Sequence, residues 1–252
     1  MSQSRIFNVA ISSLTKHGLM TKVDEIIKKK EKEIILPINT SSLLFMHNDP
    51  EYRKIMQEGK LVCADGISIV WAARLCGINV PERIPTTDLV NYIFDYLSVN
   101  DKPYRVFFLG GKEDVLSKSE THFRKNFPFI DLVGHYSPPF LSLEEMRLSE
   151  NENIVSILNS KQIDILFVGF GVPKQEKWCI ENYYRLNASL LIPCGGMFGF
   201  YGGEYKRAPR WIQRIGLEWF IRLCQEPRRL WRRYLFGNSL FLWLTIKELL
   251  KK

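Results

Sequence analysis

Residues 163–178 read IDILFVGFGVPKQEKW: an apolar run of strand length, a turn with two glycines and the start of a helix. The run is apolar on both faces, which is typical of a strand inside a parallel sheet that is covered on both sides. The helix is expected to begin at Pro173, since proline is favoured at the first helical position. A strand, a turn and a helix in this order form the repeating unit of α/β folds.

The same unit recurs on both sides of this stretch. Further strands are expected at EIILPIN (33–39), LVCA (61–64), RVFFLGG (105–111), FIDLVG (129–134) and SLLIPCGG (189–196). Amphipathic stretches separate them: Asp49 could cap one helix, Thr87 or Asp88 another, and Ser142 with Glu145 fits a capping box for a third. We therefore predict an α/β fold with a Rossmann-like, mainly parallel sheet flanked by helices.

Charge divides the chain into two parts. Residues 204–252 hold twelve basic and four acidic residues, so they carry the whole formal net charge of +8, and residues 1–203 are neutral. Near residues 201–210 the alternation of strands and helices gives way to helical signals alone. We predict an α/β domain over 1–203 and a helical, basic C-terminal appendage over 204–252.

The appendage has the composition of a helix that lies in a membrane interface. Basic residues alternate there with Leu, Phe and four of the six tryptophans. Nucleic acid also attracts basic segments, but the long apolar side chains favour lipid. The chain shows no apolar run long enough to cross a bilayer and no secretory signal, and its five cysteines are isolated. A cytoplasmic protein, peripheral on the inner face of the plasma membrane, is expected.

Glycine-bearing turns end three of the predicted strands. Ligands of open parallel sheets bind beyond the carboxyl ends of the strands, where helix N-termini offer N–H groups to phosphates. Three such turns at one edge therefore suggest a nucleotide. The candidate nucleotide-binding residues are Gly110, Gly111, Gly169, Gly171, Gly195 and Gly196.

Neither a metal nor a cofactor is expected. The four histidines are isolated, and the Asp-x-Asp pattern with which many sugar transferases hold a divalent ion does not occur. The sequence GFGVPK (169–174) resembles a dinucleotide-binding loop, but Lys174 replaces its third glycine and the acid that would bind the ribose is missing. An NAD-dependent oxidoreductase is therefore the less favoured alternative.

Four polar residues near the predicted strand ends are candidates for chemistry. Asp65 follows the run 61–64, where it could be a general base or simply a helix cap. Asn39 could bind sugar hydroxyls or be a turn residue, and Arg83 could bind phosphate or be a solvated surface charge. Gln175 would lie in the first turn of a helix that faces the nucleotide, unless it is a surface glutamine.

Arginines dominate the appendage. Arg222 and Arg229 would share one face of a continuous helix, with Arg233 beside them, although Pro227 makes that continuity doubtful. A solvated basic face is the simpler interpretation. The preference for Arg over Lys favours bidentate contacts with phosphate.

Taken together, these motifs resemble one family. The stretches CADGISIVWAARLCG, PERIPTTDLV, RVFFLGG, ILFVGFGVPKQEKW, CGGMFGFYGGEYKRAPRW, GLEWFIRL and EPRRLWRRY resemble the WecG/TagA/CpsF family of bacterial glycosyltransferases, in order, from about residue 34 to about residue 240. The resemblance implies metal-independent, inverting transfer of a sugar from a UDP-sugar to a polyprenyl-diphosphate-linked saccharide. It also implies a role in teichoic acid, common antigen or exopolysaccharide synthesis, with residues 1–203 as the catalytic, nucleotide-sugar-binding domain.

The resemblance also implies roles for individual residues. Asp65 matches the catalytic base, and the appendage is implied to complete the active site and dock the enzyme on the membrane. Pro37 stands where the family often has threonine, so one acceptor contact is lost or moved, for example to Thr40. The substrate-binding residues implied by the match are Asn39, Arg83, Gln175, Arg222, Arg229 and Arg232.

Three questions stay open at this point. The sequence specifies neither the sugar nor the lipid-linked acceptor, and self-association could hide the apolar surface of the appendage. A non-catalytic module that binds anionic lipid is a second alternative, beside the oxidoreductase. No nucleic acid is expected as a partner.

Overall fold

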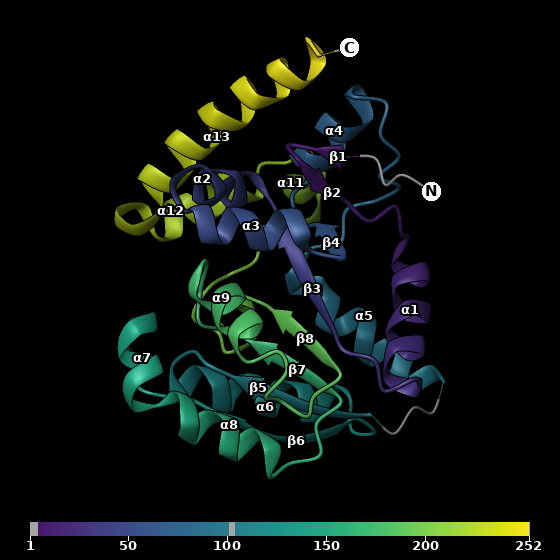
Figure 1. The fold of residues 1–252 in the computed structure, drawn as a ribbon, viewed down its shortest axis with the longest axis vertical. Coiled ribbons are helices and arrows are strands. Elements are labelled where there is room, and N and C mark those ends of the chain that lie inside the picture. The colour runs from purple at the N-terminus through teal and green to yellow at the C-terminus, as the bar shows by residue number, and fades with distance from the viewer. Residues whose placement is uncertain (1–4, 101–103, 252) are drawn as a thin grey trace. The chain divides into compact units, whose positions relative to one another are not determined.

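A six-stranded sheet organises the fold in the computed structural model, which describes residues 5–100 and 104–251. The strand order is β4-β3-β8-β7-β5-β6, and the pairs β3–β8, β8–β7, β7–β5 and β5–β6 are parallel. Helices pack on the strands, with α1 and α9 on β8, α6 on β6 and α4 on β4. The predicted α/β class is therefore confirmed (Figure 1). Residues 1–4 and 101–103 of the first predicted domain and residue 252 of the second lie outside the described residues.

Eight strands and thirteen helices make up the described part of the chain. The strands are β1 (Arg5–Ile6), β2 (Val9–Ala10), β3 (Glu33–Ile38), β4 (Leu61–Ala64), β5 (Arg105–Leu109), β6 (Asp131–Tyr136), β7 (Ile165–Val168) and β8 (Leu190–Pro193). The helices up to the end of β6 are α1 (Lys16–Lys28), α2 (Thr40–Asn48), α3 (Pro50–Glu58), α4 (Ile67–Leu75), α5 (Thr86–Val99) and α6 (Glu113–Asn126). The remaining helices are α7 (Leu143–Ser149), α8 (Asn151–Asn159), α9 (Lys174–Glu181), α10 (Met197–Tyr201), α11 (Arg210–Arg214), α12 (Glu218–Gln225) and α13 (Pro227–Leu249).

The predicted helix starts agree with the structure at two places and differ at two. Helix α9 begins at Lys174, with Pro173 as its N-cap and not as its first residue. Asp49 caps α3 by accepting a hydrogen bond from the Tyr52 N–H, and Ser142 with Glu145 forms the capping box of α7. The helix α5 begins at Thr86, so Thr87 and Asp88 lie within its first turn. Asp88 there still faces the positive end of the helix dipole, which explains its place without a capping role.

Contacts group the residues into two compact units. Unit 1 contains residues 1–15, 36–85 and 205–252, and unit 2 contains residues 16–35 and 86–204. The C-terminal segment thus belongs to the same unit as the strand β4 and the helices α2 to α4. The division into a catalytic domain and an appendage stays a prediction about function.

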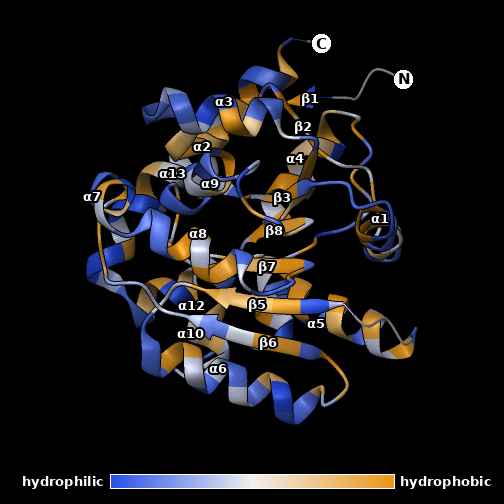
Figure 2. Cartoon of the chain, turned by 60° about the horizontal axis from the view of Figure 1, so that its bottom comes forward, coloured by the Kyte–Doolittle hydropathy of each residue, from blue (hydrophilic) through white to orange (hydrophobic). Residues whose placement is uncertain are grey.

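Aromatic packing forms the core of unit 2. The rings of Phe94, Phe108 and Phe167 lie within 6.5 Å of one another, and Phe123 and Phe198 join them. Edge-to-face pairs of this kind stabilise a core beyond their buried area by about 0.5–1.5 kcal/mol. Figure 2 shows β5, β7 and β8 as mostly hydrophobic, in keeping with strands covered on both faces.

In unit 1 the long helix α13 packs along α2 (Figure 1). Gly237 makes the close approach: a Cβ there would lie 3.5 Å from the Thr40 carbonyl oxygen. The β1–β2 hairpin joins the same helix through Phe7, whose ring meets that of Phe241 edge-on at 6.1 Å. Helix α13 is therefore an integral part of unit 1.

The cysteines are free thiols, and four of the five are buried. Burial and the charge of Asp65 raise the pKa of Cys63 to about 12. Burial also raises the pKa of Cys179 and of Cys194, whereas Cys224 is exposed on α12. Among residues 5–100 and 104–251, no helix is both long and apolar enough to cross a membrane.

Candidate active site

Asp65 and Asn39 are joined in unit 1 by a direct hydrogen bond. Asp65 follows β4 and Asn39 follows β3, and the Asn39 Nδ2 donates to Asp65 Oδ2 at 2.9 Å. The Asp65 backbone N–H also donates to the Ile38 carbonyl at 2.9 Å. The sheet thus brings together two residues that the sequence marked separately.

The start of α2 fixes the orientation of the Asn39 amide. Asn39 is the N-cap, and its Oδ1 accepts from the N–H groups of Ser41 and Ser42 at 3.0 and 3.2 Å. The Ser42 hydroxyl accepts from the Asn39 N–H, which completes a capping box. With Oδ1 engaged on the helix, Nδ2 faces Asp65. Thr40, the other acceptor candidate, is the first residue of α2.

The interpretation of Asp65 as a helix cap is wrong. Gly66, and not Asp65, occupies the N-cap position of α4, and the glycine has no side chain to cap the helix. The Asp65 carboxylate is held by Asn39 at the end of β4.

Arg83 supports the turn at Asp65. Its Nε donates to the Asp65 carbonyl at 2.7 Å, and its Nη2 pairs with Glu218 of α12 at 2.5 Å. Arg207 approaches the other Glu218 oxygen at 3.4 Å. The arginine predicted to bind substrate is thus placed beside Asp65, where its contacts hold the turn in place.

Two arginines of the appendage converge on Glu226. Arg222 contacts Glu226 at 2.9 Å and lies 3.5 Å from the centre of the Tyr205 ring. Arg229 donates to both Glu226 oxygens, and these hydrogen bonds raise the pKa of Arg229. A continuous helix is not needed for this convergence, since α12 ends at Gln225 and α13 begins at Pro227.

Arg233, and not Arg232, lies on the Asp65 side of α13. Arg232 is exposed, 5.1 Å from the centre of the Trp231 ring. The Arg233 guanidinium lies over Phe45 of α2, its Nε is buried, and burial lowers its pKa despite the opposing effect of Asp65. The spacing of four residues from Arg229 is the sequence signal that points to this face.

Four of the predicted nucleotide-binding glycines need their conformational freedom. Gly171 and Gly195, in the turns after β7 and β8, have φ of +83° and +55°, and Gly110 and Gly111 after β5 are also positive. Such angles strongly favour glycine. At Gly169 the reason is space, because a Cβ would lie 2.7 Å from the Phe198 ring. Gly196 precedes α10 as its N-cap.

Gln175 is buried in unit 2, so the interpretation as a surface glutamine is wrong. It is 1% exposed, and its Oε1 accepts from the N–H groups of Gly171 and Gly195 at 3.1 and 2.9 Å. The side chain therefore bridges two of the glycine turns. In sequence, a polar residue in the first turn of a helix is typical of a solvated surface, so the pattern gives no signal for this bridge.

Lys174 is a further residue at this edge that the sequence did not single out for function. Its Nζ donates to the Leu141 carbonyl at 2.7 Å and lies 5.6 and 5.2 Å from the ring centres of Phe140 and Phe170. Burial lowers the pKa of this lysine. It places a cation at the start of α9, the helix that follows the second glycine turn.

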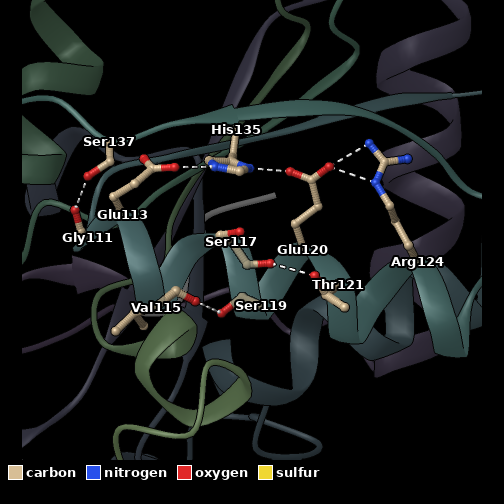
Figure 3. Close-up of polar contacts among 10 residues, drawn as sticks. All are labelled: Gly111, Glu113, Val115, Ser117, Ser119, Glu120, Thr121, Arg124, His135 and Ser137. Carbon is tan, nitrogen blue, oxygen red and sulfur yellow. Dashed lines mark hydrogen bonds and ion pairs between the residues drawn. The ribbon is translucent and has the colours of Figure 1, made fainter.

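A cluster of charged residues around His135, here called the histidine cluster, lies beside the glycine turn after β5 (Figure 3). His135 of β6 contacts Glu113 at 2.9 Å and Glu120 of α6, and Arg124 also contacts Glu120 at 2.6 Å. Ser137 then donates to the Gly111 carbonyl at 2.7 Å, which ties the segment after β6 to the turn after β5. Within the residues that the structure describes, no three His, Cys, Asp or Glu side chains gather as metal ligands. Metal independence stays a prediction.

Comparison with known proteins gives a consistent match. A sequence model described as the glycosyl transferase WecG/TagA/CpsF family matches residues 4–252. A Bacillus subtilis strain 168 protein, N-acetylglucosaminyldiphosphoundecaprenol N-acetyl-beta-D-mannosaminyltransferase, is 30% identical over 83% of this chain and 77% of its own. Proteins of the same description from Bacillus spizizenii and Staphylococcus aureus strain MW2 are 28% and 24% identical, over 74% and 77% of this chain and 68% and 76% of theirs.

Proposed function

The chain belongs to the WecG/TagA/CpsF family of glycosyltransferases, and we propose that it transfers a sugar from a UDP-sugar to a polyprenyl-diphosphate-linked saccharide. The transfer inverts the anomeric carbon and uses no metal. The hydrogen bond from Asn39 to Asp65 is the observation that carries this proposal, because it holds a carboxylate in one orientation at a strand end. The described relatives suggest N-acetylmannosamine as the sugar and N-acetylglucosaminyl-diphosphoundecaprenol as the acceptor to test first.

Asp65 acts as the general base of this reaction. Its carboxylate takes the proton from the attacking acceptor hydroxyl as the new glycosidic bond forms. In the same displacement the bond from the anomeric carbon to the UDP oxygen breaks, and UDP leaves with the electron pair. One displacement on the face opposite the leaving group gives inversion.

The UDP group is bound by the glycine turns of unit 2. The starts of α6 and α9 follow two of these turns, so their free N–H groups and positive dipole ends can offset the diphosphate charge. Lys174 adds a fixed positive charge at the start of α9. Stabilising the leaving group in this way replaces the role that a divalent ion has in other transferases.

The acceptor diphosphate is bound by the arginines of the C-terminal segment. Arg222, Arg229 and Arg232 are the residues that the resemblance implies, and the position of Arg233 over Phe45 of α2 supports adding it. Arg222 and Arg229 pair with one carboxylate, Glu226, and Arg233 of α13 lies over Phe45, so positive charge gathers here for a phosphorylated ligand.

The membrane surface is contacted by exposed apolar residues of α13. Trp231, Leu235, Leu242, Ile246 and Leu249 are exposed, and their spacing places them on one stripe of the helix. Arg229, Arg233 and Gly237 lie on the opposite side, which packs against α2. This stripe supports peripheral binding at the inner face of the plasma membrane. When the protein is not bound to a membrane, copies of the chain would associate through the same stripe.

The test of the reaction is release of UDP from a panel of UDP-sugars mixed with a short-chain polyprenyl-diphosphate saccharide. UDP should form only when both substrates are present, and Asp65→Asn should slow turnover by about 10²- to 10⁴-fold. Turnover of Asp65→Asn close to that of the wild type would contradict the assignment of the base. Thermal protection by NAD but not by UDP would instead favour the oxidoreductase alternative.

The test of membrane binding uses flotation with anionic vesicles of phosphatidylglycerol and phosphatidylcholine. Leu235→Ser, Leu242→Ser and Ile246→Ser together should weaken binding at unchanged melting temperature, because these side chains are exposed. The matched control is Phe129→Ser with Leu148→Ser, which removes exposed apolar side chains of unit 2. Equal flotation of all three proteins would contradict the role of the stripe.

A further inference from the structure

Two polar residues at the start of α9 are among the most buried of unit 2. Gln175 is 1% exposed and Glu176 is 0% exposed, although charged and amide side chains at a helix start are usually solvated. Burying a carboxylate is costly unless hydrogen bonds compensate it. Their burial therefore calls for a reason beyond helix formation.

Hydrogen bonds connect these two residues to two glycine turns. The Gln175 Nε2 donates to Glu176 Oε1 at 2.9 Å, while Gln175 Oε1 accepts from Gly171 and Gly195. The Gln175 backbone N–H donates in return to the Gly171 carbonyl at 3.0 Å. One amide thus spans from the turn after β7 to the turn after β8.

The orientation of that amide matters because its two ends are chemically different. If the amide were flipped, its NH₂ group would face the two glycine N–H groups, and donors would oppose donors. An ionised carboxylate only accepts hydrogen bonds, so Glu176 stabilises the orientation in which Nε2 points toward it. Burial raises the pKa of Cys179 and of Cys194, and the neighbouring Glu176 adds to both effects.

We propose that Glu176 is a positioning residue for the nucleotide donor. Its carboxylate sets the Gln175 amide, and the amide sets the separation and direction of the N–H groups in the turns at Gly171 and Gly195. This role rests on the proposed function, in which those turns bind the UDP moiety. Gln175 accordingly acts through the turns, by holding them in the geometry that accepts the diphosphate.

Exchanging the two side chains tests this arrangement. Gln175→Glu alone places two carboxylates side by side in a buried position and should weaken UDP binding by roughly tenfold or more. Adding Glu176→Gln should restore most of the affinity. In the double variant the carboxylate at 175 still accepts from both glycines and the amide at 176 donates to it. Such recovery is the non-additivity expected of groups that act as a pair.

Single variants separate positioning from stability. Glu176→Ala should weaken UDP binding by roughly tenfold, measured by calorimetry, and raise the KM for the UDP-sugar more than the KM for the lipid acceptor. Glu176→Gln keeps an acceptor oxygen and should retain most of the affinity and the fold. The matched control is Asn151→Ala, which removes the buried partner of Trp178 on the same helix and should lower the melting temperature only.

Each outcome decides the matter. Glu176→Ala protein that binds UDP as tightly as wild type, an exchange variant no better than Gln175→Glu, or equal UDP weakening by Asn151→Ala would each overturn the positioning role. Wild-type protein without affinity for UDP would overturn the proposed function and this role with it. If the wild-type protein binds UDP but the variants do not show the expected changes in UDP affinity, only the positioning role is overturned.

Discussion

The Asn39 side chain performs two tasks at once: its oxygen caps α2 and its nitrogen donates to the Asp65 carboxylate at 2.9 Å. The cap fixes which end of the amide faces the aspartate, so the start of a helix orients the proposed base. A residue with this double function links the stability of α2 to the chemistry of Asp65.

Substitutions at Asn39 should separate the two tasks. Asn39→Ser keeps a capping oxygen but has no N–H group to reach Asp65, so turnover should fall at nearly unchanged melting temperature. Asn39→Ala loses both and should also lose about 1 kcal/mol of stability. Steady-state kinetics and thermal unfolding measure the two effects. Wild-type turnover in Asn39→Ser would contradict the orienting role.

Arg233 should matter more than Arg232 for the lipid acceptor. Arg233→Met removes the buried guanidinium on the Asp65 side and should raise the acceptor KM by roughly tenfold, with little change in UDP affinity. Arg232→Met alters an exposed side chain and should have the smaller effect. The two KM values, measured with the same short-chain acceptor, provide the comparison. A reversed order would place the acceptor diphosphate on the other side of α13.

The histidine cluster should make stability depend on pH. Burial opposes protonation of His135, but its bonds to Glu120 and Glu113 outweigh this and raise its pKa above 6.5. The stabilisation of the fold by His135 is therefore full below about pH 6.5 and is lost as the pH rises through the raised pKa. Burial raises the pKa of Glu120, but hydrogen bonds with His135 and Arg124 outweigh this effect and lower the pKa. Glu120 therefore stabilises the fold at pH values above its ordinary pKa, and this stabilisation is lost as the pH falls through the lowered pKa.

His135→Gln measures this dependence. The difference in melting temperature between wild type and His135→Gln should be largest near about pH 6 and should shrink by about pH 8.5. His122→Gln serves as the control, because burial lowers the pKa of that histidine and it titrates in the opposite sense. A difference that stays constant across this range would show that the cluster acts through packing alone.

Gly237 sets the approach of α13 to α2. A Cβ at this position would have its nearest neighbouring atoms at 3.5 to 3.9 Å, which is ordinary contact. Gly237→Ala should therefore be neutral or stabilising by up to about 1 kcal/mol, since alanine favours helix. Gly237→Leu should destabilise unit 1 by forcing the helices apart. Urea unfolding of the two variants distinguishes space from flexibility as the reason for glycine.

The sheet could be predicted because its strands are apolar on both faces and are separated by helices. The limits of the strand β6 could not be predicted. The run 129–134 is apolar, but Phe129 is 87% exposed and β6 begins at Asp131. Hydrophobicity shows which residues can be buried, while backbone pairing decides which residues are in the strand.

The candidate site was predictable residue by residue but not as an arrangement. Asp65 and Asn39 were each recognisable from strand ends, yet their contact depends on β3 and β4 being neighbours. Gln175 looks like a surface residue in the sequence, and the spacing of Arg233 from Arg229 does not reveal that their face of α13 packs against α2. The contacts of His135 with α6 likewise depend on folding, because fifteen residues separate it from Glu120.

The distribution of thiols has a practical use. Four are enclosed, with the pKa of Cys63 at about 12, whereas Cys224 stands open to solvent on α12, close in sequence to Arg222 and Glu226. A maleimide dye added near neutral pH will therefore mark the wild-type protein at a single position. Such a probe would report the arrival of vesicles or phosphorylated lipids in real time, without any engineered cysteine.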